Sequence, residues 1–346
     1  MSFFDAVKKT LDEKIKGTWG LVIMHKDEPE KLIVCRNGSP ILIGFSQNAI
    51  YVASESVAFE KYTSNYIKLE DKEIVYIDLK NKQDFYKNIK ERIQTVHFVD
   101  AQTKPKSPYS TFFEQEIMEQ PEALMKCMNY GARLAGEPGS AKLGGFDENK
   151  DELLGIRHLI IVACGTSYYA ALYGVKLYKL LGCFETVQAI LASELTEEDF
   201  PENDTGVLLL SQSGETADVY RALKIAQKKG FPSIGITNVV GSLIATSVNC
   251  GIFLNSGREV AVPATKSFTC QITALSLSAL WFSHHKGIKH KFKLRTQISG
   301  WMHSLPMSVG NVLYTVDEKC KELANLLVKE EHLFILGKGL TDPIVK

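Results

Sequence analysis

Two short segments rich in hydroxyl side chains are the first candidates for binding chemistry. Cys164-Gly165-Thr166-Ser167 follows one apolar run, and Ser211-Gln212-Ser213-Gly214-Glu215-Thr216 follows another. Hydroxyl groups can donate hydrogen bonds to phosphate oxygens, and glycine lets the backbone approach a ligand closely. Each segment precedes a predicted helix, whose N-terminus offers free N–H groups and the positive end of the helix dipole. The two segments therefore point to a small ligand that carries phosphate.

Helix capping is the alternative explanation for these hydroxyls, because Ser and Thr are favoured N-cap residues. Capping two helices needs fewer hydroxyl side chains than the two segments supply, which are Thr166, Ser167, Ser211, Ser213 and Thr216. The ligand interpretation is therefore preferred. Neither segment matches the glycine pattern of dinucleotide-binding folds or of the P-loop, so no nucleotide cofactor is predicted.

A third segment runs from Glu259 to Thr269 and leads into a long apolar helix. Thr265 can cap that helix, and Lys266 falls in its first turn. A positive charge there opposes the helix dipole. Lys266 is therefore predicted to face an anion or an acidic side chain, with a solvent-facing lysine as the alternative.

The elements that must position these segments alternate between strand and helix from residue 157 onward. Strands are predicted at 158–163, 187–191, 207–210, 233–237 and 250–253, and helices at 168–181, 216–229 and 265–282. Continuous apolar strands joined through helices predict an α/β fold with a doubly wound parallel sheet covered on both faces. Ligands of such sheets bind outside the carboxyl ends of the strands, where the hydroxyl-rich segments lie.

The first part of the chain has a different pattern of apolar and turn residues. Residues 17–79 read as short strands separated by turn signals, which predicts a largely antiparallel β meander, and Asn37-Gly38 predicts a hairpin. Residues 101–109 form a predicted linker that contains two prolines and two lysines.

The segments that flank the α/β region are predicted as follows. The spacing from Thr111 to Glu114 is that of a capping box, and the helix it begins is interrupted near Pro121. Residues 131–150 are predicted to be a loop. A helical region runs to about residue 329, and residues 332–339 then repeat the first α/β unit's opening, an apolar strand that leads into a glycine turn.

Composition excludes several classes of protein. Forty basic and forty acidic residues cancel, so no net field attracts nucleic acid or a membrane surface. No apolar run is long enough to span a bilayer. The seven cysteines form no CxxC pair and no zinc-ligand spacing, and no secretory signal is visible, which favours a reducing compartment and a cytoplasmic protein. The length of 346 residues predicts roughly two domains at about 150 residues each.

Taken together, the segments resemble the sugar isomerase (SIS) module of the glutamine–fructose-6-phosphate aminotransferase, or glucosamine-6-phosphate synthase, family. Residues 162–167, 211–216 (SQSGET) and 265–269 carry this likeness. Residues 17–21, 36–44 and 69–74 resemble the last third of the family's glutaminase domain, and residues 113–121 its inter-domain helix. The resemblance implies an SIS-type doubly wound parallel sheet preceded by the β-rich C-terminal part of an Ntn-type glutaminase domain.

The resemblance also implies domain boundaries and a truncation at both ends. Residues 1–100 would be a partial glutaminase domain, 101–150 the linker and inter-domain helix, 151–285 the first SIS domain, and 286–346 a helical connection with the start of a second SIS domain. The chain opens with Met1-Ser2-Phe3-Phe4, where the family has Met-Cys-Gly-Ile with its nucleophilic cysteine. The family's isomerase residues belong to the second SIS module and its tail, so no catalytic residue is assigned in this chain.

The family makes glucosamine-6-phosphate from fructose-6-phosphate and glutamine. By resemblance, the sugar phosphate would be held by Thr166, Ser167, Ser211, Gln212, Ser213 and Thr216, with the backbone of Val262 beside the sugar. Ala261, Pro263 and Ala264 depart from the family pattern, which has smaller or hydroxyl-bearing residues there. The expected function is a portion of such an aminotransferase, and the alternatives are a non-catalytic sugar-phosphate binder or a decayed paralogue. No metal, cofactor, nucleic acid or membrane partner is expected, and the family suggests a homo-oligomer that forms through the SIS domains.

Overall fold

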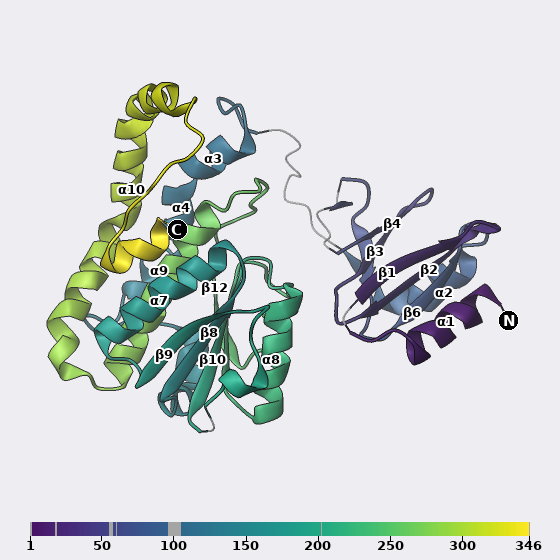
Figure 1. The fold of residues 1–346 in the computed structure, drawn as a ribbon, viewed down its shortest axis with the longest axis horizontal. Helices are drawn as coiled ribbons and strands as arrows, with labels where there is room; N and C mark the ends of the chain where they lie inside the picture. Colours follow the sequence, from purple (N-terminus) through teal and green to yellow (C-terminus); the bar gives the residue numbers. More distant parts are fainter. Residues whose placement is uncertain are drawn as a thin grey trace. The chain divides into compact units, whose positions relative to one another are not determined.

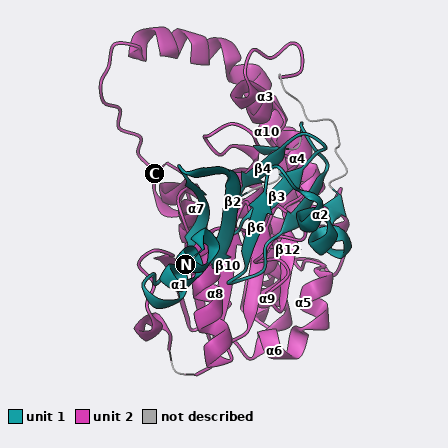
Figure 2. Cartoon of the chain, turned by 90° about the vertical axis from the view of Figure 1, so that its right-hand side faces the viewer, with its two compact units in different colours: residues 1–103 teal, residues 104–346 magenta. Residues whose placement is uncertain are grey.

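The computed structural model describes residues 2–17, 19–54, 58–59, 61–95, 105–201 and 203–345. The chain divides into two compact units, residues 1–103 and residues 104–346 (Figure 2). Each unit has a hydrophobic core of its own.

The first unit consists of a short N-terminal helix and two antiparallel sheets. Helix α1 (Phe3–Glu13) is capped by Ser2, whose Oγ accepts a hydrogen bond from the N–H of Asp5 at 3.1 Å. One sheet has the order β1-β2-β6 and the other β4-β3-β5-β7. The strands are β1 (Trp19–His25), β2 (Glu28–Asn37), β3 (Leu42–Phe45), β4 (Ile50–Ala53), β5 (Asn65–Lys68), β6 (Ile74–Asp78) and β7 (Gln94–Thr95), and α2 (Gln83–Ile89) and a 3₁₀ turn (Lys90–Arg92) lie between the last two. The predicted antiparallel character is confirmed, whereas α1 and α2 were not predicted.

The predicted hairpin at Asn37-Gly38 is wrong. Strand β2 pairs with β1 and β6, while β3 pairs with β4 and β5, so the turn carries the chain from one sheet to the other. Gly38 has the positive φ of the predicted turn (79°), but its N–H donates to Asp71 Oδ1 at 2.6 Å instead of closing a hairpin. The turn signal specifies only the local backbone, and strand partners are decided by burial elsewhere in the unit.

The second unit opens with two short helices, α3 (Phe112–Met118) and α4 (Gln120–Cys127). The Oγ1 of Thr111 accepts from the N–H of Glu114 at 3.1 Å, and Pro121 lies in the first turn of α4, so the predicted cap and interruption are confirmed. The predicted loop at 131–150 is partly wrong, because it contains a 3₁₀ turn (Ala132–Leu134) and helix α5 (Gly144–Glu148), and α6 (Lys150–Leu154) begins at its end. Phe146 explains α5, since its buried ring packs edge-on against Trp281 at 5.3 Å between centroids.

A five-stranded parallel sheet forms the centre of the second unit, in the order β12-β11-β10-β8-β9 (Figure 1). Its strands are β8 (His158–Ala163), β9 (Thr186–Leu191), β10 (Thr205–Ser211), β11 (Ser233–Thr237) and β12 (Cys250–Phe253), with a 3₁₀ turn (Glu197–Asp199) before β10. Helices α7 (Thr166–Leu181) and α9 (Lys266–His285) cover one face, and α8 (Ala217–Lys229) covers the other. The doubly wound parallel fold is therefore confirmed.

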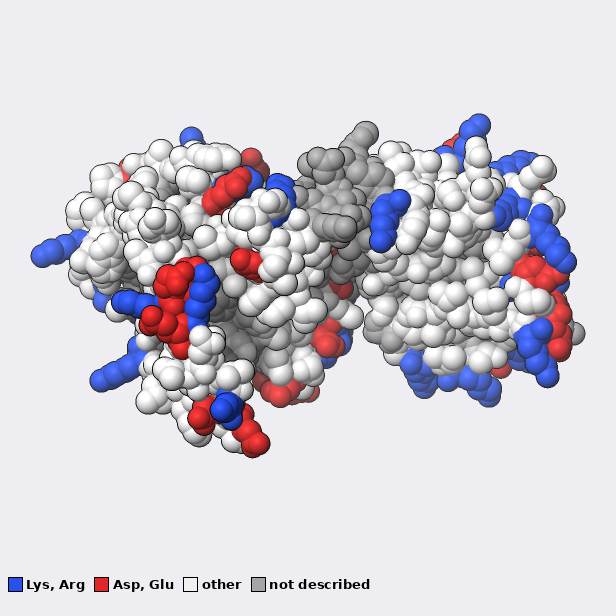
Figure 3. Space-filling model, turned by 90° about the horizontal axis from the view of Figure 1, so that it is seen from above, with Lys and Arg blue, Asp and Glu red and all other residues white. Residues whose placement is uncertain are grey.

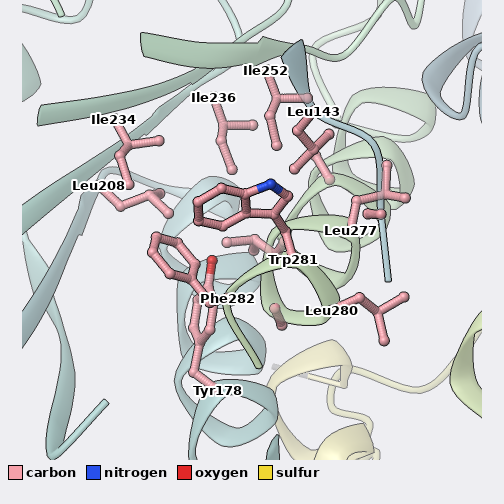
Figure 4. Packing of buried hydrophobic residues seen from close by; sticks show 14 of the residues in the cluster. Leu143, Tyr178, Leu208, Ile234, Ile236, Ile252, Leu277, Leu280, Trp281 and Phe282 are labelled. Atoms are coloured by element: carbon pink, nitrogen blue, oxygen red, sulfur yellow. The ribbon is translucent and has the colours of Figure 1, made fainter. Parts of the chain in front are cut away.

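Both faces of this sheet are buried, which explains the continuous apolar runs. In β8, Leu159 and Ile161 pack with α7 and α9, while Ile160 and Val162 pack with α8. On the α7–α9 face, Trp281 lies among aliphatic side chains of the strands and of α9, with Phe282 and Tyr178 alongside (Figure 4).

The C-terminal part of the unit consists of a 3₁₀ turn (Lys289–Lys291), the long helix α10 (Phe292–Leu327) and a final 3₁₀ helix (Gly339–Ile344). The predicted strand that begins at residue 332 is wrong: residues 333–338 have no regular secondary structure. Phe334 and Leu336 are 92% and 91% exposed. A strand needs a neighbour for its backbone hydrogen bonds, and none of the described strands pairs with this segment.

The described residues form neither a surface of a single charge on the face shown in Figure 3 nor a membrane-spanning helix. Basic and acidic side chains are interspersed on the face shown in Figure 3. None of the described helices combines the length and the apolar character needed to cross a bilayer.

Candidate functional site

The strand order creates an opening beside the first hydroxyl-rich segment. Strands β8 and β10 are neighbours, but the chain leaves β8 toward β9 on one side and leaves β10 toward β11 on the other. The loops after β8 and β10 therefore diverge at the carboxyl edge of the sheet, the position where doubly wound folds bind ligands.

A cavity of about 240 Å³ lies at this edge. Its lining combines hydroxyl, amide, carboxylate and small apolar side chains: Thr166, Ser167, Gln212, Glu259, Ala261, Val262, Ala264, Ser267 and Gln271. Four of the predicted site residues, Thr166, Ser167, Gln212 and Val262, are among them. The predicted residues Ser211, Ser213 and Thr216 are not.

The N-terminus of α7 is open toward this cavity. Gly165 is its N-cap residue, with φ of 53°, and no side chain caps the helix. Ser167 instead accepts a hydrogen bond at Oγ from Nε2 of the buried Gln271 of α9, at 2.8 Å. Because Gln271 supplies that hydrogen, the hydroxyl hydrogen of Ser167 is available for another acceptor. Simple capping therefore does not explain Thr166 and Ser167.

The three remaining hydroxyls stabilise the loop that follows β10. Ser211 is 3% exposed, and its Oγ accepts from the N–H of Gly214 at 3.0 Å and lies 3.0 Å from Oγ1 of Thr216. Ser213 Oγ accepts from the N–H of Glu215 at 3.2 Å. Thr216 is the N-cap residue of α8 but makes no side-chain capping bond. These contacts fix the loop backbone around Gln212, the residue of this segment that lines the cavity.

Glu259 occupies the N-terminus of α9. Its Oε1 accepts from the N–H groups of Thr265 and Ser267 at 3.0 and 3.1 Å, and its carboxylate also accepts from both hydroxyls. A carboxylate at this position is favourable with the helix dipole. The positive end of α9 is therefore balanced by the chain itself, unlike that of α7.

Glu116 of α3 contacts the segment between β12 and α9, and Glu119, directly after α3, contacts the first residue of α9. Oε1 of Glu116 accepts from the N–H groups of Val260 and Ala261 at 2.5 and 3.3 Å. Oε2 of Glu119 lies 2.5 Å from Nζ of Lys266, which is 4% exposed. The prediction that Lys266 faces an acidic side chain is thus confirmed, and the solvent-facing alternative is wrong.

The contacts of Glu119 shift the pKa of its carboxyl group. Burial raises the pKa of this carboxyl, but hydrogen bonds from Gln115 and Lys266 outweigh it, so the net shift of the pKa is downward. The carboxylate form is therefore the one present in the folded protein at neutral pH.

Sequence reasoning did not single out Gln271 or Ser267 as site residues. They are four residues apart on α9, which places them on one face of the helix. That spacing would identify them once the start of α9 is known. Among the described residues, no group of three or more His, Cys, Asp or Glu side chains could hold a metal ion.

Comparisons with known proteins identify relatives of this chain. The family model for the SIS domain matches residues 152–281. The glutamine–fructose-6-phosphate aminotransferase (isomerizing) of Clostridium tetani is 32% identical over 334 residues, which are 96% of this chain and 54% of that protein. The enzyme of the same name from Thermococcus kodakarensis is 31% identical over 99% of this chain and 55% of its own length. The chain thus spans about half the length of these curated relatives.

A solved structure matches as well. The C-terminal domain of glucosamine-fructose-6-phosphate aminotransferase from Francisella tularensis aligns with a TM-score of 0.59 at 27% identity, over 69% of this chain and 66% of that one. Sequence and structure therefore lead to the same relatives. Residues 152–281 form a SIS domain, and the chain belongs to the glutamine–fructose-6-phosphate aminotransferase family.

Proposed function

We propose that the cavity at the carboxyl edge of the sheet binds a hexose 6-phosphate, fructose-6-phosphate or glucosamine-6-phosphate. In this proposal the chain is a portion of an aminotransferase that makes glucosamine-6-phosphate from fructose-6-phosphate and glutamine. The observation that carries it is the meeting of the open α7 N-terminus with the side chains of Thr166, Ser167 and Gln212 in one small cavity.

These groups suit a phosphate dianion. Hydroxyl and amide hydrogens donate to phosphate oxygens, and the helix end adds a positive partial charge. A volume of about 240 Å³ is below the usual range for drug-sized ligands, which favours a monosaccharide phosphate. Ser211, Ser213 and Thr216 support the site in this proposal by shaping the loop that presents Gln212.

One observation favours a binding module over a complete catalytic site. Among the described lining residues, Glu259 is the ionisable one, and its carboxylate is already held by four donors from Thr265 and Ser267. A general acid or base needs access to the proton that it transfers. The second candidate is therefore a sugar-phosphate-binding protein without turnover of its own, and we propose that it assembles as a homo-oligomer through the SIS domain.

Calorimetry with fructose-6-phosphate and with unphosphorylated fructose tests the proposal. We expect binding of the phosphorylated sugar and much weaker binding of fructose, because the phosphate supplies the charge that the α7 N-terminus attracts. Absence of fructose-6-phosphate binding at millimolar concentration would contradict the site. Ammonia release from glutamine by this chain would contradict a binding role alone, and light scattering in solution measures the oligomeric state.

A further inference from the structure

We propose that Glu116 of α3 and Glu119, the residue that follows α3, are positioning residues for the cavity. They would hold residues 254–265, which we call the site loop, in the conformation that completes the lining. This inference rests on the proposed function, because the cavity is taken to be the sugar-phosphate site. It adds a role for α3, a helix that does not line the cavity.

The site loop is held near its two ends, where Ser256 donates to Asn238 and Thr265 donates to Glu259, and its middle relies on Glu116. It joins β12 to α9 and contains no helix or strand, yet it supplies Glu259, Ala261, Val262 and Ala264 to the lining. Val262 is fully exposed, so its side chain does not anchor the loop by packing. A loop with few buried apolar contacts opens locally at low cost unless polar contacts hold it.

Glu116 holds the middle of the site loop. Its side chain is almost completely buried, at 2% exposure, and its carboxylate accepts from the N–H groups of Val260 and Ala261. A buried carboxylate is costly unless it is well hydrogen-bonded. The Glu116 carboxylate therefore needs these two N–H donors. In turn, the two hydrogen bonds fix the backbone of Val260 and Ala261 at the edge of the cavity.

Glu119 acts directly after the end of the site loop. It pairs with Lys266, whose charge in the first turn of α9 is unfavourable with the helix dipole. Nε2 of Gln115 donates to the Glu119 carboxylate at 2.6 Å and keeps it in place. Lys266 directly precedes Ser267, which lines the cavity. Glu116 thus holds the middle of the site loop, and Glu119, the residue that follows α3, holds the first residue of α9.

Neighbouring carboxylates do not share this role. Glu114 accepts from the N–H and hydroxyl of Ser110 at 2.9 Å, at the start of its own helix. Glu122 pairs with Lys126 at 2.7 Å within α4, and its side chain is 60% exposed. Glu122→Gln is therefore a matched control, since it makes the same chemical change away from the site loop.

The first experiment is hydrogen exchange of the ligand-free chain. Glu116→Gln removes the charge and turns an amide group toward the N–H donors, so we expect faster exchange in residues 256–265. Exchange in β8 and β10 should stay as in the wild type, which separates loop positioning from general destabilisation. Unchanged exchange of the site loop in Glu116→Gln would overturn the inference whether or not the wild type binds a sugar phosphate.

The second experiment is calorimetry with fructose-6-phosphate on the same variants. If the competent loop conformation falls to a tenth of the population, the Kd rises about tenfold. We expect this rise for Glu116→Gln and no change for Glu122→Gln. Equal affinity of Glu116→Gln and wild type would also overturn the inference, whereas a wild type that does not bind would overturn the proposed function instead.

A double-mutant cycle tests the ion pair between Glu119 and Lys266. If Glu119 acts through Lys266, the pair Glu119→Gln and Lys266→Met should weaken binding no more than the worse single variant. Strictly additive losses would show that the two residues act separately and would overturn the role assigned to Glu119. Methionine is unbranched and one atom shorter than lysine, so Lys266→Met replaces most of the apolar stem and removes the charge.

Discussion

At the scale of single residues, the role of each hydroxyl depends on its place relative to the cavity and on its partners. Ser211 and Thr216 bond to each other inside the loop after β10, and Ser213, which accepts from the N–H of Glu215, does not line the cavity. Ser167 accepts from Gln271 and keeps its own hydrogen for another partner. The difference comes from the neighbours of each serine, since the residue type is the same.

Ser167→Ala should therefore weaken the binding of fructose-6-phosphate. A hydrogen bond to a charged group contributes about 1.5 kcal/mol at the low end of its range, so we expect a Kd roughly tenfold higher by calorimetry. Ser304→Ala is the control, because that exposed hydroxyl donates to the carbonyl of Trp301 on α10, at 3.0 Å. Equal losses in the two variants would contradict a specific role for Ser167.

Lys286 gives a second prediction at this scale. Its Nζ lies 4.4 Å from the centre of the Phe184 ring, and burial lowers its pKa to about 8, although Cys183 and Glu185 oppose the shift. In the unfolded chain a lysine titrates near pH 10.4. Between about pH 8 and pH 10 the unfolded state therefore binds more protons, so the free energy of unfolding should rise with pH.

The comparison with Lys286→Met isolates this effect from other titrating groups. The stability of the wild type relative to that variant should increase from about pH 8 to about pH 10 and stay flat below pH 8, where both states are protonated. Urea unfolding at several pH values measures the difference. Lys179→Met, which removes an exposed lysine of α7, is the control. If the wild type instead loses stability relative to Lys286→Met between about pH 8 and about pH 10, the lowered pKa of Lys286 is contradicted.

At the scale of elements, the loop between β10 and α8 is held by a close backbone approach. Gly214 has φ of 68°, and a Cβ at this position would lie 2.0 Å from Oγ of Ser242 and 2.6 Å from its Cβ. Gly230, at the end of α8, has nearly the same φ of 72° but has open space around it. Substitution of Gly230 therefore measures the effect of the positive φ alone, whereas substitution of Gly214 adds the steric clash.

Gly214→Ala should destabilise the protein more than Gly230→Ala. The positive φ alone costs roughly 1 kcal/mol, and at Gly214 the clash with Ser242 adds to it. Chemical denaturation measures both losses. The double variant Gly214→Ala, Ser242→Gly should recover part of the difference, because it removes the side chain that the new Cβ meets. Equal losses at the two glycines would contradict the packing around Gly214.

At the scale of the whole molecule, the two units have separate cores and are joined in sequence near residue 103. Multi-domain chains commonly unfold in more than one step. A ligand that binds one folded unit stabilises that unit by mass action.

Scanning calorimetry should therefore resolve two unfolding transitions. Fructose-6-phosphate should raise the midpoint of the transition that belongs to residues 104–346 and leave the other in place. Tryptophan fluorescence assigns the transitions in part, because Trp281 is buried in the second unit. A ligand shift confined to the first unit would contradict the position of the site.

The amino-acid sequence by itself determined the parallel sheet and the cap at Thr111. The central strands β8 and β10 are largely continuous apolar runs, which is the pattern of strands that are buried on both faces of a sheet. The cap depends on atoms three residues apart, whereas the unfavourable charge of Lys266 at a helix start left several partners open until the structure showed Glu119.

Only the tertiary structure decided the contacts between distant segments. Glu116 meets Val260 across 144 positions of sequence, and Gln271 meets Ser167 across 104. The turn at Gly38 and the apolar segment at 333–336 show the same limit: their residues favour a hairpin and a strand, but pairing needs a neighbour with free backbone groups. Local propensity sets what a segment can form, and the remaining chain decides whether its hydrogen bonds are met.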